Sequence, residues 1–134
     1  MPDKVEFELV APEALVASAA ADMVVVPGTE GDFGVLPGHA PMISLVRPGI
    51  IDVHNEGAVT ERIFVAGGFA EVTQTRLTVL VEEAAAVDAL DRGAIEARLE
   101  GARKEAGAAE TEAEKAAAEK EIALARAMLA AIIE

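Results

Sequence analysis

The chain has 134 residues, 52% of them apolar and only 3% aromatic, which is enough for about one domain, or a small domain with an appendage. Its 24 acidic and 11 basic residues give a formal charge of −13. This charge argues against binding to nucleic acid or anionic lipid, because both need clustered Lys and Arg. The absence of cysteine excludes disulfides, thiolate metal sites and a cysteine nucleophile.

Residues 1–87 have the alternation and punctuation of short strands. Val5, Phe7 and Leu9 alternate with acids, which predicts a strand with one face in water. Residues 24–26 are continuously apolar, which predicts a strand buried on both faces. Further strands are expected at 42–46, 50–54, 58–65, 69–73 and 77–83, with Gly- and Pro-containing turns between them. This spacing predicts an antiparallel sandwich or barrel in a mostly β protein of the α+β class.

Residues 27–41 hold four glycines and three prolines between apolar runs. Glycine permits positive φ, whereas proline pins φ near −65°, so both residue types shape a backbone rather than loosen it. We predict a rigid loop at a sheet edge that holds Glu30, Asp32 and His39 in fixed positions. Such a loop suits docking better than catalysis.

Residues 88–134 have helical periodicity and form the second predicted domain, after a sandwich domain at 1–87. Asp88 resembles an N-cap with Asp91 at the third helical position, and Gly107 is expected to end this helix near residue 105. Thr111 and Glu114 predict a capping box for a second helix. Apolar positions are expected at Leu90, Ala94, Ala97 or Arg98, with Ile95, Leu99 and Ala102, and then at Ala118, Ile122, Ala125, Leu129 and Ile132. A short turn between the two helices predicts an antiparallel hairpin.

Side chains with catalytic chemistry are few. Neither His39 nor His54 has metal-ligand spacing, and neither Ser18 nor Ser44 lies in a G-x-S-x-G elbow. The glycines near residue 28 lack the Lys-Ser/Thr of a phosphate loop, and without Trp or Tyr a sugar-binding module lacks aromatic stacking faces. We therefore expect a non-enzyme. A coiled-coil chaperone or another free-standing binding module is the alternative.

The order of these features, with the motifs at 28–41, 47–50 and 64–73, closely resembles the epsilon subunit of the bacterial F-type ATP synthase, the counterpart of mitochondrial delta. The match covers essentially the full length. The resemblance implies a ten-strand sandwich followed by a two-helix domain, without an active site. It also implies a place in the rotary central stalk, where the subunit couples the proton-driven c-ring to the gamma shaft for ATP synthesis. The implied location is the cytoplasmic face of the bacterial inner membrane, as a peripheral protein.

The resemblance also implies which residues meet the partners. The loop with Glu30, Gly31 and Asp32 would face the polar and basic loops of the c-ring. His39, between Pro37-Gly38 and Ala40-Pro41, would lie on the surface that faces gamma. The C-terminal helices could reach the catalytic alpha/beta head.

Two departures from the family concern the helices. Many members bind ATP through Ile/Leu-Asp followed, after two residues, by Arg-Ala; here Leu90-Asp91 is followed by Arg92 and Gly93, and then by Ala94 and Ile95. Asp91, Arg92 and Arg98 could form only a weak nucleotide site, so we expect no cofactor. Residues 111–134 carry three bases against five acids, which predicts weak or absent inhibition through an acidic target in the catalytic head.

Overall fold

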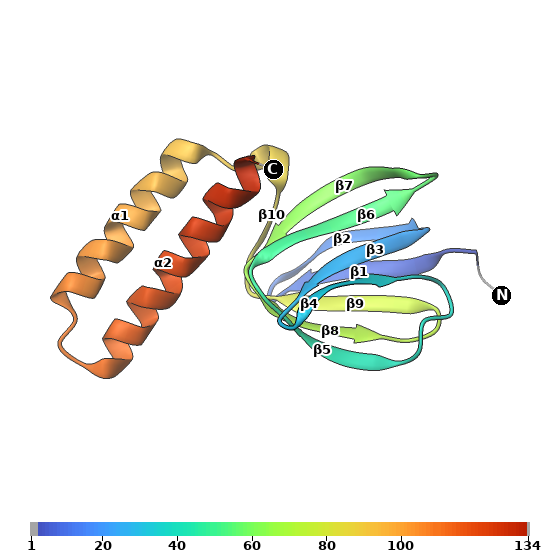
Figure 1. The fold of residues 1–134 in the computed structure, drawn as a ribbon, viewed down its shortest axis with the longest axis horizontal. Coiled ribbons are helices and arrows are strands. Elements are labelled where there is room, and N and C mark those ends of the chain that lie inside the picture. Colours follow the sequence, from blue (N-terminus) through green and yellow to red (C-terminus); the bar gives the residue numbers. More distant parts are fainter. Residues whose placement is uncertain (1–2, 134) are drawn as a thin grey trace. The chain divides into compact units, whose positions relative to one another are not determined.

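The computed structural model describes residues 3–133, which form two compact units that divide between Ala86 and Val87 (Figure 1). The first unit contains the strands, and the second contains one turn of 3-10 helix, η1 (Val87–Ala89), and two α-helices. The predicted fold class, a ten-strand sandwich followed by two helices, is confirmed.

The ten strands of residues 3–133 form one hydrogen-bonded network. They are β1 (Val5–Ala11), β2 (Ala14–Ala21), β3 (Met23–Gly28), β4 (Gly31–Val35), β5 (Met42–Val46), β6 (Gly49–Asn55), β7 (Ala58–Val65), β8 (Gly68–Val72), β9 (Arg76–Val81) and β10 (Ala84–Ala86). Their order is β10-β7-β6-β3-β5-β8-β9-β1-β2, with β4 paired to β3. Every pair is antiparallel except β1 with β9, which is parallel.

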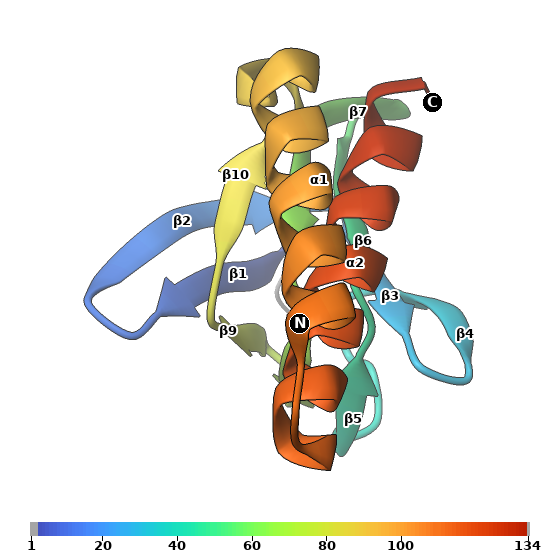
Figure 2. The same ribbon diagram turned by 90° about the vertical axis from the view of Figure 1, so that its left-hand side faces the viewer.

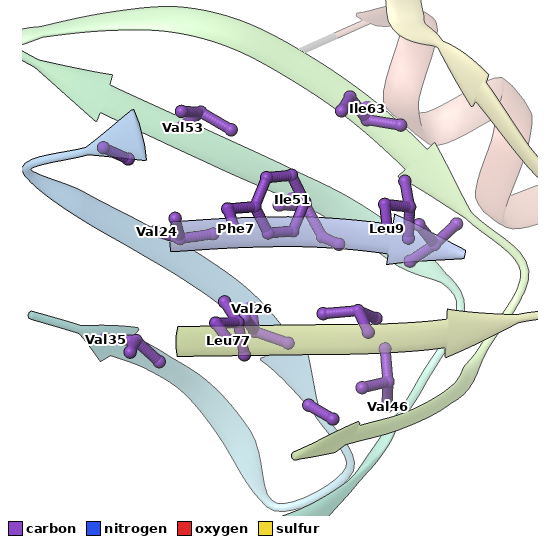
Figure 3. Close-up of a cluster of buried hydrophobic side chains, with 14 of the residues drawn as sticks. Phe7, Leu9, Val24, Val26, Val35, Val46, Ile51, Val53, Ile63 and Leu77 are labelled. Atoms are coloured by element: carbon purple, nitrogen blue, oxygen red, sulfur yellow. The ribbon is translucent and has the colours of Figure 1, made fainter. Parts of the chain in front are cut away.

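One apolar core lies inside the network. Val5, Phe7 and Leu9 are fully buried, as their alternation with acids predicts. Figure 3 shows Phe7 and Leu9 beside Ile51 and Leu77, so strands distant in sequence contribute to the same interior. A buried side chain of this size contributes about 1.5–3 kcal/mol relative to exposure. The core therefore explains why the strands close on one another.

The prediction that residues 24–26 are buried on both faces is wrong for the middle residue. Val24 and Val26 are fully buried, but Val25 is only partly buried. Successive side chains of a strand point to opposite faces, so β3 places two valines in the core and the third on the outer face.

The predicted rigid loop at residues 27–41 is wrong at residues 27–28 and 31–35, which belong to strands. The strands β3 and β4 pair from Val24↔Val35 to Gly28↔Gly31, so the stretch keeps only a two-residue turn at 29–30 and a loop at 36–41. Pro27 is buried within β3, where its carbonyl accepts a hydrogen bond from the Arg47 N–H at 2.8 Å. Strand pairing has overridden the low strand propensity of glycine and proline here. Proline lacks an N–H donor but keeps its carbonyl, which can still accept a hydrogen bond within a sheet.

Sequence patterns missed β2 and β10, which consist largely of alanine. Alanine is a weak strand former, and its small side chain gives little alternation to detect. These strands exist because β1 and β7 offer them hydrogen-bonding partners.

The second unit is a hairpin of α1 (Arg92–Ala108) and α2 (Glu112–Ile133), which lie side by side (Figure 2). The expected N-cap at Asp88 is wrong, because that residue belongs to η1 and Asp91 occupies the N-cap without a side-chain cap hydrogen bond. Gly107 does not end the helix, which continues to Ala108. A single glycine costs about 1 kcal/mol in a helix, so the neighbouring turns can retain it.

The predicted capping box of α2 is present in one half, the hydrogen bond to the Thr111 side chain. The Glu114 N–H donates to Thr111 Oγ1 at 3.1 Å, and the Thr111 hydroxyl lies 3.1 Å from Glu114 Oε1. The predicted apolar positions are only partly right: Ile95, Leu99 and Ala102 of α1 are buried, whereas α2 buries Ala118, Ala125, Met128 and Ala131. Ile122, Leu129 and Ile132 are only partly buried, because the contact with α1 selects a face rotated from the expected stripe.

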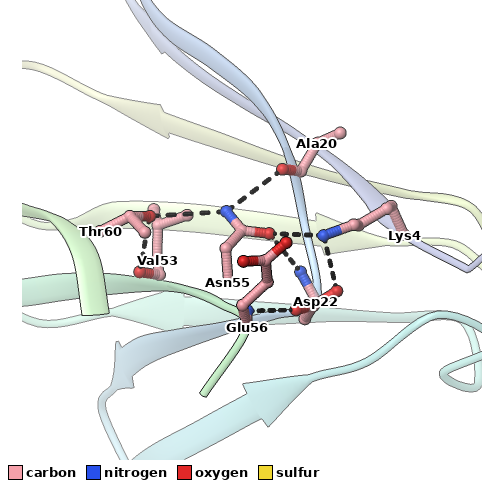
Figure 4. Close-up of polar contacts among 7 residues, drawn as sticks. All are labelled: Lys4, Ala20, Asp22, Val53, Asn55, Glu56 and Thr60. Atoms are coloured by element: carbon pink, nitrogen blue, oxygen red, sulfur yellow. Dashed lines mark hydrogen bonds and ion pairs between the residues drawn. The ribbon is translucent and has the colours of Figure 1, made fainter. Parts of the chain in front are cut away.

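A polar clasp of Lys4, Asp22, Asn55 and Glu56 joins the start of the first unit to two turns (Figure 4). The Lys4 ammonium lies 2.7 Å from the Asp22 carboxylate and donates to Asn55 Oδ1 at 2.9 Å. The Glu56 N–H donates to the same carboxylate at 2.6 Å. Hydrogen bonds from Lys4 and then from Glu56 lower the pKa of Asp22 below its usual value. The clasp thus holds the β6–β7 turn, where Glu56 has a left-handed φ of 52°.

Candidate docking surfaces

Three of the expected contact residues lie at the tip of the β3–β4 hairpin, which we call the acidic tip (residues 28–32). Thr29 and Glu30 form the two-residue turn, and Gly31 has a φ of +132°, a conformation that favours glycine. A Cβ on Gly28 would lie 2.7 Å from the Gly31 carbonyl oxygen, so a side chain there would displace backbone. The two glycines therefore allow a tight tip that presents Glu30 and Asp32 to solvent.

Residues of β5 and the loop after it fasten the acidic tip. The Thr29 N–H donates to the Leu45 carbonyl at 3.0 Å. Arg47 donates from Nη1 to the Gly28 carbonyl at 2.6 Å and from Nη2 to Asp32 Oδ1 at 2.7 Å. The expected stiffness of this region thus has a source that sequence reasoning did not find, a cation fifteen residues along the chain from Asp32.

His39 lies elsewhere, in the loop at residues 36–41. Its N–H donates to the Leu36 carbonyl at 3.1 Å, and the preceding Gly38 N–H donates to the Gln74 carbonyl at 2.7 Å. The His39 ring is partly buried, with Nδ1 2.7 Å from the Ala40 carbonyl oxygen. This loop enters β5 at Met42, so His39 and the acidic tip lie toward opposite ends of that strand.

Five apolar side chains cross the outer face of the sheet in one register, and we call them the apolar row: Leu45, Phe69, Leu80, Val10 and Leu15. Each is the direct partner of the next, on β5, β8, β9, β1 and β2 in turn. At about 4.8 Å between strands the row is roughly 19 Å long. Leu45 is 65% exposed and Phe69 is 46% exposed, so an apolar strip meets solvent.

Charged side chains lie beside the apolar row on the same face. Arg76 contacts Glu8 at 2.5 Å and Glu6 at 3.2 Å across the parallel β1–β9 pair. The hydrogen bond and charge of Glu8, followed by the charge of Glu6, raise the pKa of Arg76 above its ordinary value. Glu71 lies opposite Thr78 in the next row of residues. The face therefore combines an apolar strip with a mainly acidic border.

Sequence reasoning missed the apolar row as a surface. The alternation within β9 separates Leu80 from Leu77 and Val79, so this strand alone contains one outward apolar residue, whereas β5 contains two, Ile43 and Leu45. A single exposed leucine is ordinary. Only the register of five strands reveals that these residues are adjacent.

The suggested nucleotide residues do not converge. Asp91 and Arg92 lie at the start of α1, and Arg98 follows Arg92 by six residues, which places it about 9 Å further along the helix and on another face. Arg92 lies 3.9 Å from Glu96, and Arg98 is ion-paired with Glu121 of α2. Both guanidinium groups thus already have acidic neighbours.

Two other kinds of site are absent from the described part of the chain. Residues 3–133 contain no cluster of three His, Cys, Asp or Glu side chains that could hold a metal ion. Neither of the two described α-helices is long and apolar enough to cross a membrane.

Comparison with known proteins identifies the family. A sequence profile described as the beta-sandwich domain of the ATP synthase delta/epsilon chain matches residues 4–87. The ATP synthase epsilon chain of Rhodospirillum rubrum is 54% identical over 131 residues, which covers 98% of both chains. The chain belongs to the ATP synthase epsilon chain family. The epsilon chain of Paramagnetospirillum magneticum is also similar, with 51% identity over 98% of this chain and 99% of that one.

Solved structures share the fold of this family member. A chain in the mitochondrial ATP synthase of Euglena gracilis superposes with a TM-score of 0.82 and 24% identity, over 98% of this chain and 83% of that one. A chain in the central stalk and c-ring assembly of Tetrahymena thermophila gives a TM-score of 0.64 at 18% identity, over 96% of each. At these identities the likeness concerns the architecture.

Proposed function

We propose that this protein is the non-catalytic epsilon subunit of the central stalk, which couples the proton-driven c-ring to the gamma shaft during ATP synthesis. The observation that carries the proposal is the match to epsilon chains over nearly the whole length, both units included. The assembly named for the Tetrahymena neighbour, a central stalk with its c-ring, supports the choice of partners.

The first unit suits a mechanical coupling. A rotor part must transmit torque without deforming, and ten strands around one apolar core resist shear because interiors are closely packed. Contact points on such a body must also be held in place. The acidic tip is held by Arg47 and by the Leu45 carbonyl, and the loop with His39 is held by Gln74.

Two surfaces are assigned to two partners. Glu30, Gly31 and Asp32 would contact the c-ring, whose partner loops would supply basic and polar groups. His39, together with the apolar row, would face gamma. The row supplies the apolar centre that a stable interface needs, and its acidic border would favour basic residues on gamma.

The subunit would sit at the membrane only through the complex. Family membership makes it part of ATP synthase, and we propose the cytoplasmic face of the bacterial inner membrane as its location. The helical unit would at most touch the alpha/beta head, and weakly, because residues 111–134 are net acidic. It would bind no cofactor tightly.

Binding to gamma tests this function directly. The chain should co-purify with gamma and the c-ring, and binding of gamma should raise its melting temperature by mass action. Phe69→Asp, in the apolar row, should weaken the gamma complex by about 10- to 100-fold, the cost of losing one large apolar contact. Val59→Asp is the matched control, since Val59 is 44% exposed on β7 and lies outside the row.

The opposite pattern would refute the proposal. The protein is not a rotor subunit if it binds neither gamma nor the c-ring. The same holds if adding it to an ATP synthase complex without an epsilon subunit does not restore coupled ATP synthesis. Capture of a mixture of unfolded clients would instead support the chaperone alternative. Equal effects of Phe69→Asp and Val59→Asp would remove the apolar row from the gamma interface.

A further inference from the structure

We propose that Arg47 is the positioning residue of the acidic tip, and that by neutralising Asp32 it leaves Glu30 as the carboxylate that a basic partner group meets. The inference rests on the proposed docking of this tip on the c-ring. Of the three neighbouring charged side chains, Arg47 and Asp32 form an ion pair that holds the tip together. Glu30 is the acid that remains available to a partner.

The fastening is built from three contacts of one residue. The backbone N–H of Arg47 donates to the Pro27 carbonyl at 2.8 Å, and its guanidinium donates to the Gly28 carbonyl at 2.6 Å and to Asp32 at 2.7 Å. Pro27 and Gly28 belong to β3, whereas Asp32 belongs to β4. Arg47 therefore holds both strands of the hairpin from one side.

The guanidinium is suited to this task in a way that an ammonium is not. Its planar fork presents donors at fixed angles, so Nη1 can bind a carbonyl while Nη2 binds a carboxylate. A lysine at position 47 could provide the charge, but a single ammonium on a flexible chain would not fix both strands together.

The two carboxylates of the acidic tip, Asp32 and Glu30, differ in how freely they can pair with a basic group of a partner. The Asp32 carboxylate lies 2.7 Å from a cation, so its field is largely cancelled at the distance of a docking partner. Glu30 lies at the turn, exposed, and among residues 3–133 no hydrogen bond or ion pair involves its side chain. The net charge of the three groups is −1, and Glu30 carries it.

The first experiment tests positioning without any partner, by amide hydrogen exchange in the full chain. Arg47→Gln should speed exchange of the Thr29 N–H, which donates to Leu45, by about tenfold, because the tip opens locally. Arg62→Gln, which disrupts the Arg62–Asp52 pair on β6 and β7, should leave Thr29 unchanged. Arg47→Lys should also speed exchange. Unchanged exchange at Thr29 in Arg47→Gln would overturn the positioning role.

The second experiment tests the charge assignment with the c-ring carrying gamma, taken from the same organism as the chain. Glu30→Gln should weaken binding by about five- to tenfold at low salt, and the difference should shrink as salt screens the charge. The double variant Asp32→Asn/Arg47→Gln removes one charge of each sign and leaves the tip at −1. It should bind more weakly through loss of order, yet keep the salt dependence of the wild type.

These outcomes separate the inference from the proposed function. If the double variant loses the salt dependence while Glu30→Gln keeps it, Asp32 is the contact acid and the charge assignment is wrong. If the wild-type chain does not bind the ring at all, the proposed docking is wrong and the charge assignment falls with it. The exchange measurement still decides the role of Arg47 in that case.

Discussion

The two units of this protein are stabilised by different kinds of burial. The sandwich fully buries large side chains, including Phe7, Leu9, Ile51 and Leu77. The helical hairpin buries seven side chains in its described residues, and four of them are alanines. Because stabilisation scales with the apolar area removed from water, the sandwich is the stiff body and the hairpin is the weaker unit. A coupling between rotating parts needs that stiffness at its contact surfaces.

The largest expected effect is a change in the sandwich core. Phe7→Ala should lower the free energy of unfolding of the sandwich by about 3–5 kcal/mol, because it leaves a cavity among residues that cannot collapse. Leu99→Ala in α1 should cost about 2–3 kcal/mol and act on the hairpin. Urea unfolding followed by residue-resolved hydrogen exchange measures both. Equal destabilisation of both units by each change would show that the sandwich and the hairpin do not differ in this way.

A smaller effect is expected at the start of α2. Thr111→Ala removes the hydroxyl that accepts the Glu114 N–H, which should destabilise the hairpin by about 1 kcal/mol. Thr111→Ser keeps the acceptor and is the control. Thermal unfolding monitored by helical circular dichroism gives the value, and equal stability of both variants would show that the cap contributes nothing.

The polar clasp should make the sandwich sensitive to acid. The pKa of Asp22 is lower in the folded chain than its model-compound value of 3.8, so its contribution to stability is present above that pH. This stabilisation is lost as the pH falls below 3.8 and through the pKa that Asp22 has in the folded chain, because the protonated carboxyl no longer forms an ion pair with Lys4. The Asp22→Asn variant should therefore show a shallower loss of melting temperature on acidification.

Asp52 supplies the control for this measurement. It pairs with Arg62 at 3.3 Å outside the clasp, and Asp52→Asn should leave the acid dependence of the clasp in place. An acid profile of Asp22→Asn identical to that of the wild type would mean that the clasp carries no pH-dependent stability.

The smallest expected effects concern ATP. Calorimetry on the full chain should detect no micromolar affinity, because Arg92 and Arg98 lie on different faces of α1 and have acidic neighbours. Loss of a charge-assisted phosphate contact costs about 1.5–3 kcal/mol, or one to two decades in affinity. Deleting residues 88–134 should likewise change the rate of ATP hydrolysis by the complex little. Micromolar binding, or a several-fold rise in hydrolysis, would contradict these expectations.

Local patterns predicted much of the fold but failed where pairing overrode them. The alternation of Val5, Phe7 and Leu9 and the side-chain cap at Thr111 depend on neighbours in sequence, and both are present in the structure. The stretch at 27–41 was expected to be a loop because it is rich in glycine and proline, yet β3 and β4 extend into it. The buried face of α2 differs from the predicted apolar stripe, because the contact with α1 decides which residues of α2 are covered.

The sequence by itself determined the two kinds of secondary structure, their order along the chain and, through its motifs, the family. Those properties depend on short-range periodicity and on the order of particular residues. The tertiary structure alone decided the apolar row and the Arg47 contacts with Gly28 and Asp32. Both depend on the register between strands, where a shift of one residue would turn every side chain to the other face, and no local pattern specifies that register.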